Sequence, residues 1–133
     1  MKKRIAAVLI MLCAAVMVFT SCGSPKTLED YVNKHSDVKK ELEQIASSSG
    51  MEITVKDNTV TYKYALTTSV PDDNVSIYRS SYEKSFSSYR SQFAGYVKQV
   101  EDESGIDGVD FKILVTDKDG KELYSQSITS SDN

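Results

Sequence analysis

Apolar and polar residues alternate between Met51 and Leu66, on both sides of the dipeptide Asp57-Asn58. The apolar positions are Met51, Ile53, Val55, Val60, Tyr62, Tyr64 and Leu66. A period of two is typical of a strand buried on one face, and Asp and Asn both tolerate the positive φ of a tight turn. The pattern therefore predicts an antiparallel hairpin in which Val55 faces Val60 and Ile53 faces Tyr62.

Two helices are predicted before this hairpin. Apolar residues at helical spacing favour a short helix at about 28–34, with Thr27 as its N-cap, and a longer helix at about 37–48, with Ser36 as its cap. Gly50 is suited to the left-handed turn that ends the second helix.

The longest amphipathic stretch runs from about residue 73 to residue 104, and Gly105 ends it. Its apolar positions recur at steps of three and four residues: Val75, Tyr78, Tyr82, Phe86, Tyr89, Phe93, Tyr96, Val97 and Val100. A single helix of this length would measure roughly 48 Å, about twice a seven-residue strand. We therefore expect it to bend, with Gly95 as the candidate position, or to overhang the sheet.

An overhanging helix would expose part of its aromatic stripe. Tyr78, Tyr82 and Phe86 lie in its N-terminal half. Because an exposed apolar stripe normally marks an interface, these three residues are the predicted surface for a protein partner or for self-association.

A second hairpin follows. Val109, Phe111, Ile113 and Val115 alternate as a third strand, Asp117-Lys118-Asp119-Gly120 forms a turn, and a fourth strand runs from Leu123 to Ile128. Two registers fit the turn. A three-residue loop with Gly120 as a bulge pairs Val115 with Leu123, whereas a two-residue Asp119-Gly120 turn pairs Val115 with Tyr124.

These elements predict an α+β fold of two layers, in which tandem αββ units place helices on one face of a four-stranded antiparallel sheet. Either the first or the second hairpin would supply the central strands. Thr, Lys and Glu on the strands would discourage pairing at the free edges.

The first 24 residues have a different character. Lys2, Lys3 and Arg4 precede an apolar run of 15 residues, Ile5–Phe19, and Thr20-Ser21-Cys22-Gly23 closes it. This run is typical of a secretory signal peptide and is too short for a membrane span. The motif before Cys22 resembles the lipobox of bacterial lipoproteins, although Phe19 stands where leucine is usual. The resemblance implies that Cys22 receives a diacylglyceryl group and becomes the new N-terminus.

This interpretation divides the chain into a signal peptide (1–21), an anchor with a short linker (22–26), a single α+β domain (27–129) and a polar tail (130–133). Removing the signal peptide takes away three positive charges, so the formal net charge changes from −3 to −6. An acidic surface argues against nucleic acid as a partner. Cys13 leaves with the signal and Cys22 carries the lipid, so no disulfide framework is expected.

Over most of the mature chain, the order of segments resembles small lipoproteins of Gram-positive bacteria that carry a domain of unknown function. The resemblance is carried by the segments Thr27–Val32, Met51–Tyr64 and Asp119–Tyr124. It implies an envelope location and supplies no activity, substrate or catalytic residue. The order of elements is also similar to β-lactamase-inhibitor-type envelope modules, by architecture alone.

Three short motifs contain residue types that could carry chemistry. His35-Ser36-Asp37 contains the residue types of a hydrolase triad, but neighbouring residues do not converge on one substrate, so a helix cap is favoured. Asp117-Lys118-Asp119-Gly120 lacks the flanking acids of a calcium loop, so a turn is favoured. Glu101-Asp102-Glu103 is the candidate acidic patch for a cation or a basic partner. With one histidine and no usable cysteine, neither a metal nor a cofactor is predicted.

The sequence predicts a non-catalytic, lipid-anchored domain on the outer face of the cell membrane, which binds a partner or supports an envelope assembly. Cys22 is the only residue to which it assigns chemistry. The first alternative is an inhibitor or binding module for an extracellular protein, such as a peptidase or a cell-wall enzyme. The second is an envelope hydrolase, whose required convergence of acids, bases or nucleophiles is not visible in the sequence.

Overall fold

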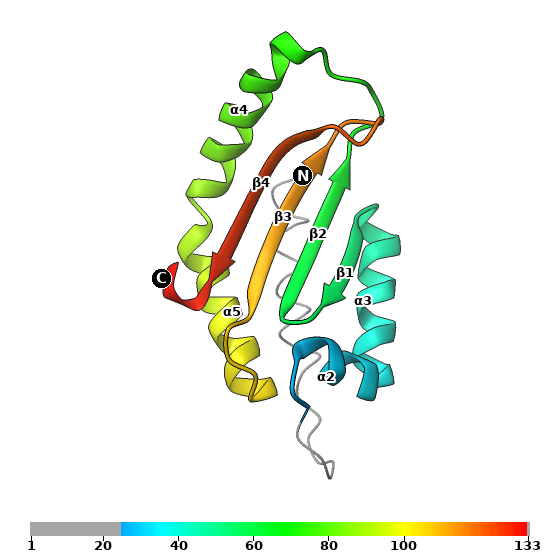
Figure 1. The fold of residues 1–133 in the computed structure, drawn as a ribbon, viewed down its shortest axis with the longest axis vertical. Coiled ribbons are helices and arrows are strands. Elements are labelled where there is room, and N and C mark those ends of the chain that lie inside the picture. Colours follow the sequence, from blue (N-terminus) through cyan, green and yellow to red (C-terminus); the bar gives the residue numbers. More distant parts are fainter. Residues whose placement is uncertain (1–24, 133) are drawn as a thin grey trace.

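The computed structural model describes residues 25–132, so the predicted signal peptide and Cys22 lie outside the described residues. Within this range, four α-helices and four strands follow one another as two helices, a hairpin, two helices and a second hairpin (Figure 1). The α+β class is therefore confirmed.

The first two helices are α2 (Leu28–Lys34) and α3 (Ser36–Ser49). The Asp30 backbone N–H donates to Thr27 Oγ1 at 3.1 Å, which confirms Thr27 as the N-cap. Ser36 is already helical and His35 occupies the cap position of α3, without a side-chain cap, so the prediction for Ser36 was wrong. Gly50 ends α3 with φ at 71°, in the left-handed region as predicted.

The first hairpin has the predicted register. It consists of β1 (Glu52–Lys56) and β2 (Thr59–Ala65), in which Val55 pairs with Val60 and Ile53 with Tyr62. Asp57 takes the positive φ of the turn, at 51°. The start of α2 holds this turn, because Leu28 N–H donates to Asn58 Oδ1 at 3.0 Å and Glu29 N–H donates to the Asp57 carbonyl at 2.9 Å.

The predicted long helix is interrupted. A short 3-10 turn, η1 (Asp72–Asn74), leads into α4 (Val75–Ser87), and α5 (Arg90–Ser104) follows after a break at Ser88-Tyr89. The predicted bend at Gly95 was wrong, since Gly95 lies within α5. At the break, the hydroxyls of Ser87 and Ser88 donate to carbonyls three residues back, where they compete with the helical ladder.

The second hairpin combines features of both predicted alternatives. In β3 (Asp110–Thr116) and β4 (Glu122–Thr129), Thr116 pairs with Glu122 but Val115 pairs with Tyr124, so Leu123 is an extra residue in a β-bulge. The turn itself is the three-residue type, because Asp117 N–H donates to the Lys121 carbonyl at 2.9 Å and Gly120 has φ at 86°. Beyond the bulge, Val115 therefore pairs with Tyr124, which is the register predicted for the two-residue turn.

The sheet is mixed and has the order β1-β2-β3-β4. β2 and β3 pair in parallel, with Thr59 opposite Asp110 and Tyr62 opposite Ile113, so the prediction of a wholly antiparallel sheet was wrong. Both predicted strand orders were also wrong, because each hairpin supplies one central strand. The cause is the path of α4 and α5, which return the chain to the end of the sheet where β2 begins (Figure 1).

Helices cover one face of the sheet, as predicted. Helices α2 and α3 pack against β1, while α4 and α5 pack against β4. The strand residues that are buried on this face are Val60, Tyr62, Phe111, Ile113, Val115, Tyr124 and Ile128. The opposite face carries rows of side chains that are not buried, such as Thr54, Thr61, Lys112 and Ser127 in register. Among residues 25–132, no helix has the length and apolar character needed to cross a bilayer.

Candidate functional site

A buried polar cluster centres on Asp117, directly after β3. The Asp117 side chain is almost completely buried, at 1 % exposed. One carboxylate oxygen accepts from Val70 N–H at 3.1 Å, and the other accepts from the N–H groups of Asp119 and Lys121, both at 2.9 Å. Burial alone would raise the pKa of Asp117, but these three backbone donors and the Lys121 ammonium outweigh it and lower the pKa below its ordinary value.

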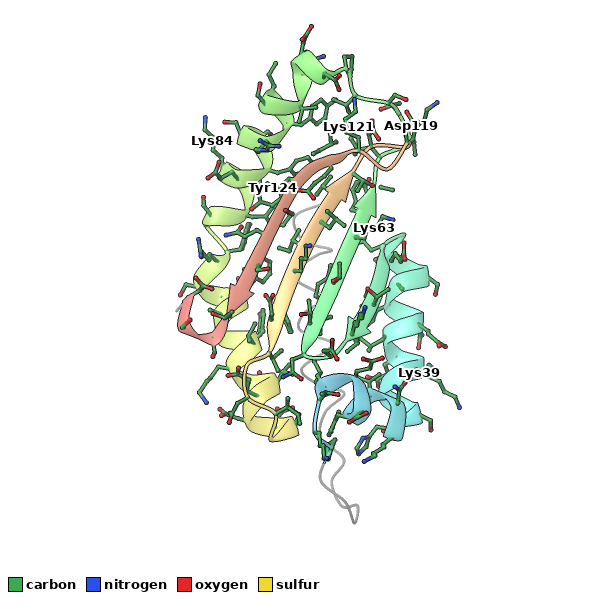
Figure 2. All side chains as sticks on the ribbon, in the orientation of Figure 1. Lys39, Lys63, Lys84, Asp119, Lys121 and Tyr124 are labelled. Atoms are coloured by element: carbon green, nitrogen blue, oxygen red, sulfur yellow. The ribbon has the colours of Figure 1, made fainter. Side chains whose placement is uncertain are left out.

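Lys121 extends this cluster onto the loop between β2 and α4. Its ammonium group donates to the Val70 carbonyl at 2.9 Å and to Asp72 at 2.6 Å, and the bond to Asp72 is the main cause of its raised pKa. The Ser69 hydroxyl donates to the Asp119 carboxylate. Together these bonds fasten the β2–α4 loop to the β3–β4 turn. Figure 2 shows Asp119 and Lys121 at the end of the molecule opposite to α2.

A second polar feature lies beside β4, where α4 gives way to α5. A pocket of about 230 Å³ is lined by Glu83, Ser87, Arg90, Tyr124, Ser125 and Gln126. The Tyr124 hydroxyl donates to Gln126, while its ring stacks on Phe86 with centroids 5.6 Å apart. Burial raises the pKa of Tyr124, and the negative charge of Glu83 raises it further. The lining thus places a carboxylate close to a phenol.

Arg90 connects this region to the end of the described chain. Its guanidinium donates to Asp132 at 2.6 Å, and the other oxygen of Asp132 accepts from Thr129 N–H at 2.8 Å. The Thr129 N–H and then Arg90 lower the pKa of Asp132. Ser130–Asp132, the described part of the predicted polar tail, accordingly form a 3-10 turn, η2.

The predicted aromatic surface is divided by the fold. Phe86 is buried, at 7 % exposed, because its ring packs between α4 and β4 against Tyr124. Tyr78 and Tyr82 are half-buried and pack against the same core. The large hydrophobic side chain that α4 exposes is instead Ile77, at 65 %.

The predicted acidic patch is also divided, because successive helical residues point in directions about 100° apart. Glu101 is buried, and its Oε1 accepts from the N–H groups of Gly108 and Val109 at 3.0 and 3.1 Å. Asp102 is exposed and pairs with Lys98. Glu103 is half-buried, and its carboxylate accepts from the Gln99 amide at 2.8 Å. Glu101 therefore fixes the loop before β3, and the three carboxylates have separate surroundings.

His35 has a structural position. Its Nδ1 lies 2.7 Å from the Tyr31 carbonyl, and its ring stacks on the Tyr31 ring at 4.2 Å. Within residues 25–132, no group of three or more His, Cys, Asp or Glu side chains is arranged to hold a metal ion. Cys22, the predicted lipidation site, lies outside the described residues.

Sequence reasoning did not identify the pocket beside β4 or the buried role of Asp117. In the single helix that the sequence predicts, Glu83 and Arg90 are two turns apart, and this spacing was the available signal. In the structure the two residues lie on α4 and α5, on either side of the break. The local sequence indicates Asp117 only as a turn residue, because its partner Val70 is remote in sequence.

The chain was also compared with known proteins. A family model, described as a domain of unknown function (DUF4854), matches residues 28–128. The match begins at the first residue of α2 and ends one residue before the end of β4. No curated protein and no solved structure shows a significant match.

Proposed function

The chain belongs to the DUF4854 family, a domain of unknown function, and we propose that it is a lipid-anchored extracytoplasmic domain that acts by binding a protein partner. The anchor is supported by the sequence: a basic start, an apolar run at Ile5–Phe19, and a lipobox-like motif that ends at Cys22. Two acyl chains on Cys22 would hold the domain stably, whereas one would hold it only marginally.

The proposed anchor and the fold together predict how the domain is oriented on the membrane. Five residues, Gly23–Thr27, separate Cys22 from α2, and five extended residues span about 18 Å at most. The end of the domain that contains α2 and the Asp57-Asn58 turn would therefore lie against the membrane. The end that carries Asp119 and Lys121 would point away from it (Figure 2).

The observation that carries the binding role is the uncovered face of the sheet. All helices that contact the strands lie on the other face, which leaves polar side chains of four strands in contact with solvent. The far end is also pre-organised, since Asp117 and Lys121 hold its two loops together. A rigid surface loses little conformational freedom on binding, so it favours recognition of a partner.

Fractionation of cells that produce the full-length chain tests the proposal. We expect the chain in the membrane fraction, the Cys22→Ala variant in the soluble fraction or unprocessed, and the matched Cys13→Ala variant in the membrane fraction. On intact cells, a membrane-impermeant amine-reactive cross-linker should join the wild-type chain to one envelope protein, such as a peptidase or a cell-wall enzyme. A Cys22→Ala variant that stays processed and membrane-bound would contradict the anchor, and the absence of any cross-linked species would contradict the binding role.

A further inference from the structure

The two outer strands of the sheet are protected to different degrees. β1 begins with Glu52 and ends with Lys56, and charged residues on an outer strand discourage pairing with another chain. On β4, the stretch from Tyr124 to Thr129 contains no charged residue. β4 carries one charged residue, Glu122 at its start, so β4 is the outer strand with the longer uncharged stretch.

The hydrogen-bond pattern shows which backbone groups of β4 point outward. Asp110 N–H donates to the Asn58 carbonyl, and the Thr116 carbonyl accepts from Leu66 N–H, so even-numbered residues of β3 direct their backbone groups toward β2. Ser125 and Ser127 lie opposite two of these residues, Leu114 and Lys112. Because backbone direction alternates along a strand, the N–H and C=O groups of Ser125 and Ser127 point away from the sheet.

The end of β4 supports this assignment. Thr129, which has the same parity as Ser125 and Ser127, directs its N–H to Asp132 rather than to β3. The side chains of Ser125 and Ser127 are exposed. Two outward donors and two outward acceptors are thus available on the middle of β4, between the bulge at Leu123 and the cap at Thr129.

The charges that line the pocket beside β4 indicate which kind of side chain it would bind. Glu83 lines it together with Tyr124 and Gln126, and among the described residues Glu83 forms no ion pair, whereas Arg90 is paired with Asp132. The mature chain carries a formal net charge of −6 once the three basic residues of the signal peptide are removed. A basic side chain is therefore the complement of this pocket.

We propose that β4 binds an extended segment of a partner protein by strand addition at Ser125–Ser127, with a basic side chain of that segment in the pocket beside Glu83. Main-chain hydrogen bonds supply affinity in this mode of recognition, and a pocket for an alternate side chain supplies specificity. The inference rests on the proposed binding function and names its site.

Antiparallel pairing with a second copy of the chain does not fit this edge. β4 runs along the long axis of the molecule, and α2 lies at one end of that axis (Figure 1). Antiparallel pairing of two β4 strands would turn one copy end for end. Two copies anchored in the same bilayer through the α2 end cannot adopt that arrangement, so a separate extended segment is the favoured occupant.

The test uses the mature chain, residues 22–133 with Cys22→Ser, because the whole core lies between Leu28 and Ile128. Three capped nine-residue peptides of alternating threonine and valine, with lysine, glutamate or alanine at the centre, serve as probes. Amide NMR and hydrogen exchange follow Ser125 and Ser127. The amides of Ile53 and Val55 are an internal control, because the same parity argument directs them away from β2 at the other edge.

We expect the lysine peptide to shift the resonances of Ser125 and Ser127 and to slow their hydrogen exchange, while Ile53 and Val55 stay unchanged. Glu83→Gln should remove the preference for lysine over glutamate. Ser127→Pro should abolish binding without unfolding the sheet, since the lost N–H has no partner in β3. N-methylation of the central peptide amide should also abolish it.

Unchanged Ser125 and Ser127 amides with all three peptides, in a chain that remains folded, would overturn the inference. Concentration-dependent shifts of β4 without peptide would also overturn it, in favour of self-association. If the amide resonances and hydrogen exchange of Ser125 and Ser127 do not change, but the cross-linked envelope partner is still found, this inference is wrong and the proposed function still holds. Loss of that partner and of the membrane anchor would instead remove the proposed function.

Discussion

The Asp117 carboxylate accepts a hydrogen bond from the Val70 backbone N–H at 3.1 Å, across 47 positions of the sequence. Val70 precedes α4 and Asp117 follows β3, so this bond joins the entry of the β2–α4–α5–β3 connection to the hairpin that comes after it. The bond is buried, and it fixes the end of the molecule that would point away from the membrane.

Asp117→Ala should destabilise the protein, because it leaves the N–H groups of Val70, Asp119 and Lys121 without their acceptor. We expect a lower urea midpoint and faster hydrogen exchange at Val70 and Lys121. The matched variant is Asp119→Ala, which removes an exposed carboxylate from the same turn and only the bond from the Ser69 hydroxyl. Equal midpoints for the two variants would contradict the role assigned to Asp117.

Stability should fall in acid. The pKa values of Asp117 and Asp132 are lowered in the folded protein, whereas those in the unfolded chain lie at about 3.9. As the pH drops below about 4, the unfolded chain therefore takes up protons before the folded one, and the free energy of unfolding decreases.

Urea denaturation at a series of acidic pH values measures this effect. The double variant Asp117→Asn, Asp132→Asn should be less stable than wild type near neutral pH, and its stability should depend less on pH below about 4. A pH dependence identical to that of wild type would contradict the assignment.

Glu101→Ala should cost roughly 2 kcal/mol of unfolding free energy, because the N–H groups of Gly108 and Val109 lose their acceptor and that of Val109 is buried. The neighbouring change Asp102→Ala removes only an exposed ion pair with Lys98 and should stay within about 0.5 kcal/mol. Chemical denaturation of both variants gives the comparison. A loss for Asp102→Ala as large as that for Glu101→Ala would contradict the separate roles assigned to the two carboxylates.

Phe86→Ala should cost about 3–5 kcal/mol, since it leaves a cavity against Tyr124 in the core. Ile77→Ala on the same helix should change the unfolding free energy by less than about 0.5 kcal/mol, because Ile77 is 65 % exposed. Thermal or chemical denaturation of both variants measures the two losses of unfolding free energy. Similar stabilities for the two variants would place Phe86 on the surface, where the sequence first suggested it.

The parts of the fold that could be predicted from the sequence are those fixed by local pattern. The period of two around Asp57-Asn58 specified the first hairpin and its register, because a slip of one residue would turn Val55 and Val60 toward solvent. Thr27 and Gly50 marked helix ends through their own backbone and side-chain chemistry.

The parts that were missed depend on residues far apart in the sequence. The parallel pairing of β2 with β3 is set by the path of α4 and α5, and no periodicity within a strand reports it. The break at Ser88-Tyr89 coincides with serine hydroxyls that compete for carbonyls, in a stretch whose apolar spacing continues without interruption. The pocket at Glu83 needs β4 beside α4, which is also a tertiary relation.

Mass spectrometry of the membrane-derived chain after trypsin digestion tests the central claim most directly. Cleavage after Lys26 releases the peptide Cys22–Lys26, which is the predicted new N-terminus. We predict that this peptide carries the mass of a diacylglyceryl group on Cys22 and that no peptide from residues 1–21 accompanies it. A mature chain whose Cys22 is unmodified, or which still begins upstream of Cys22, would contradict the proposal of a lipid-anchored domain.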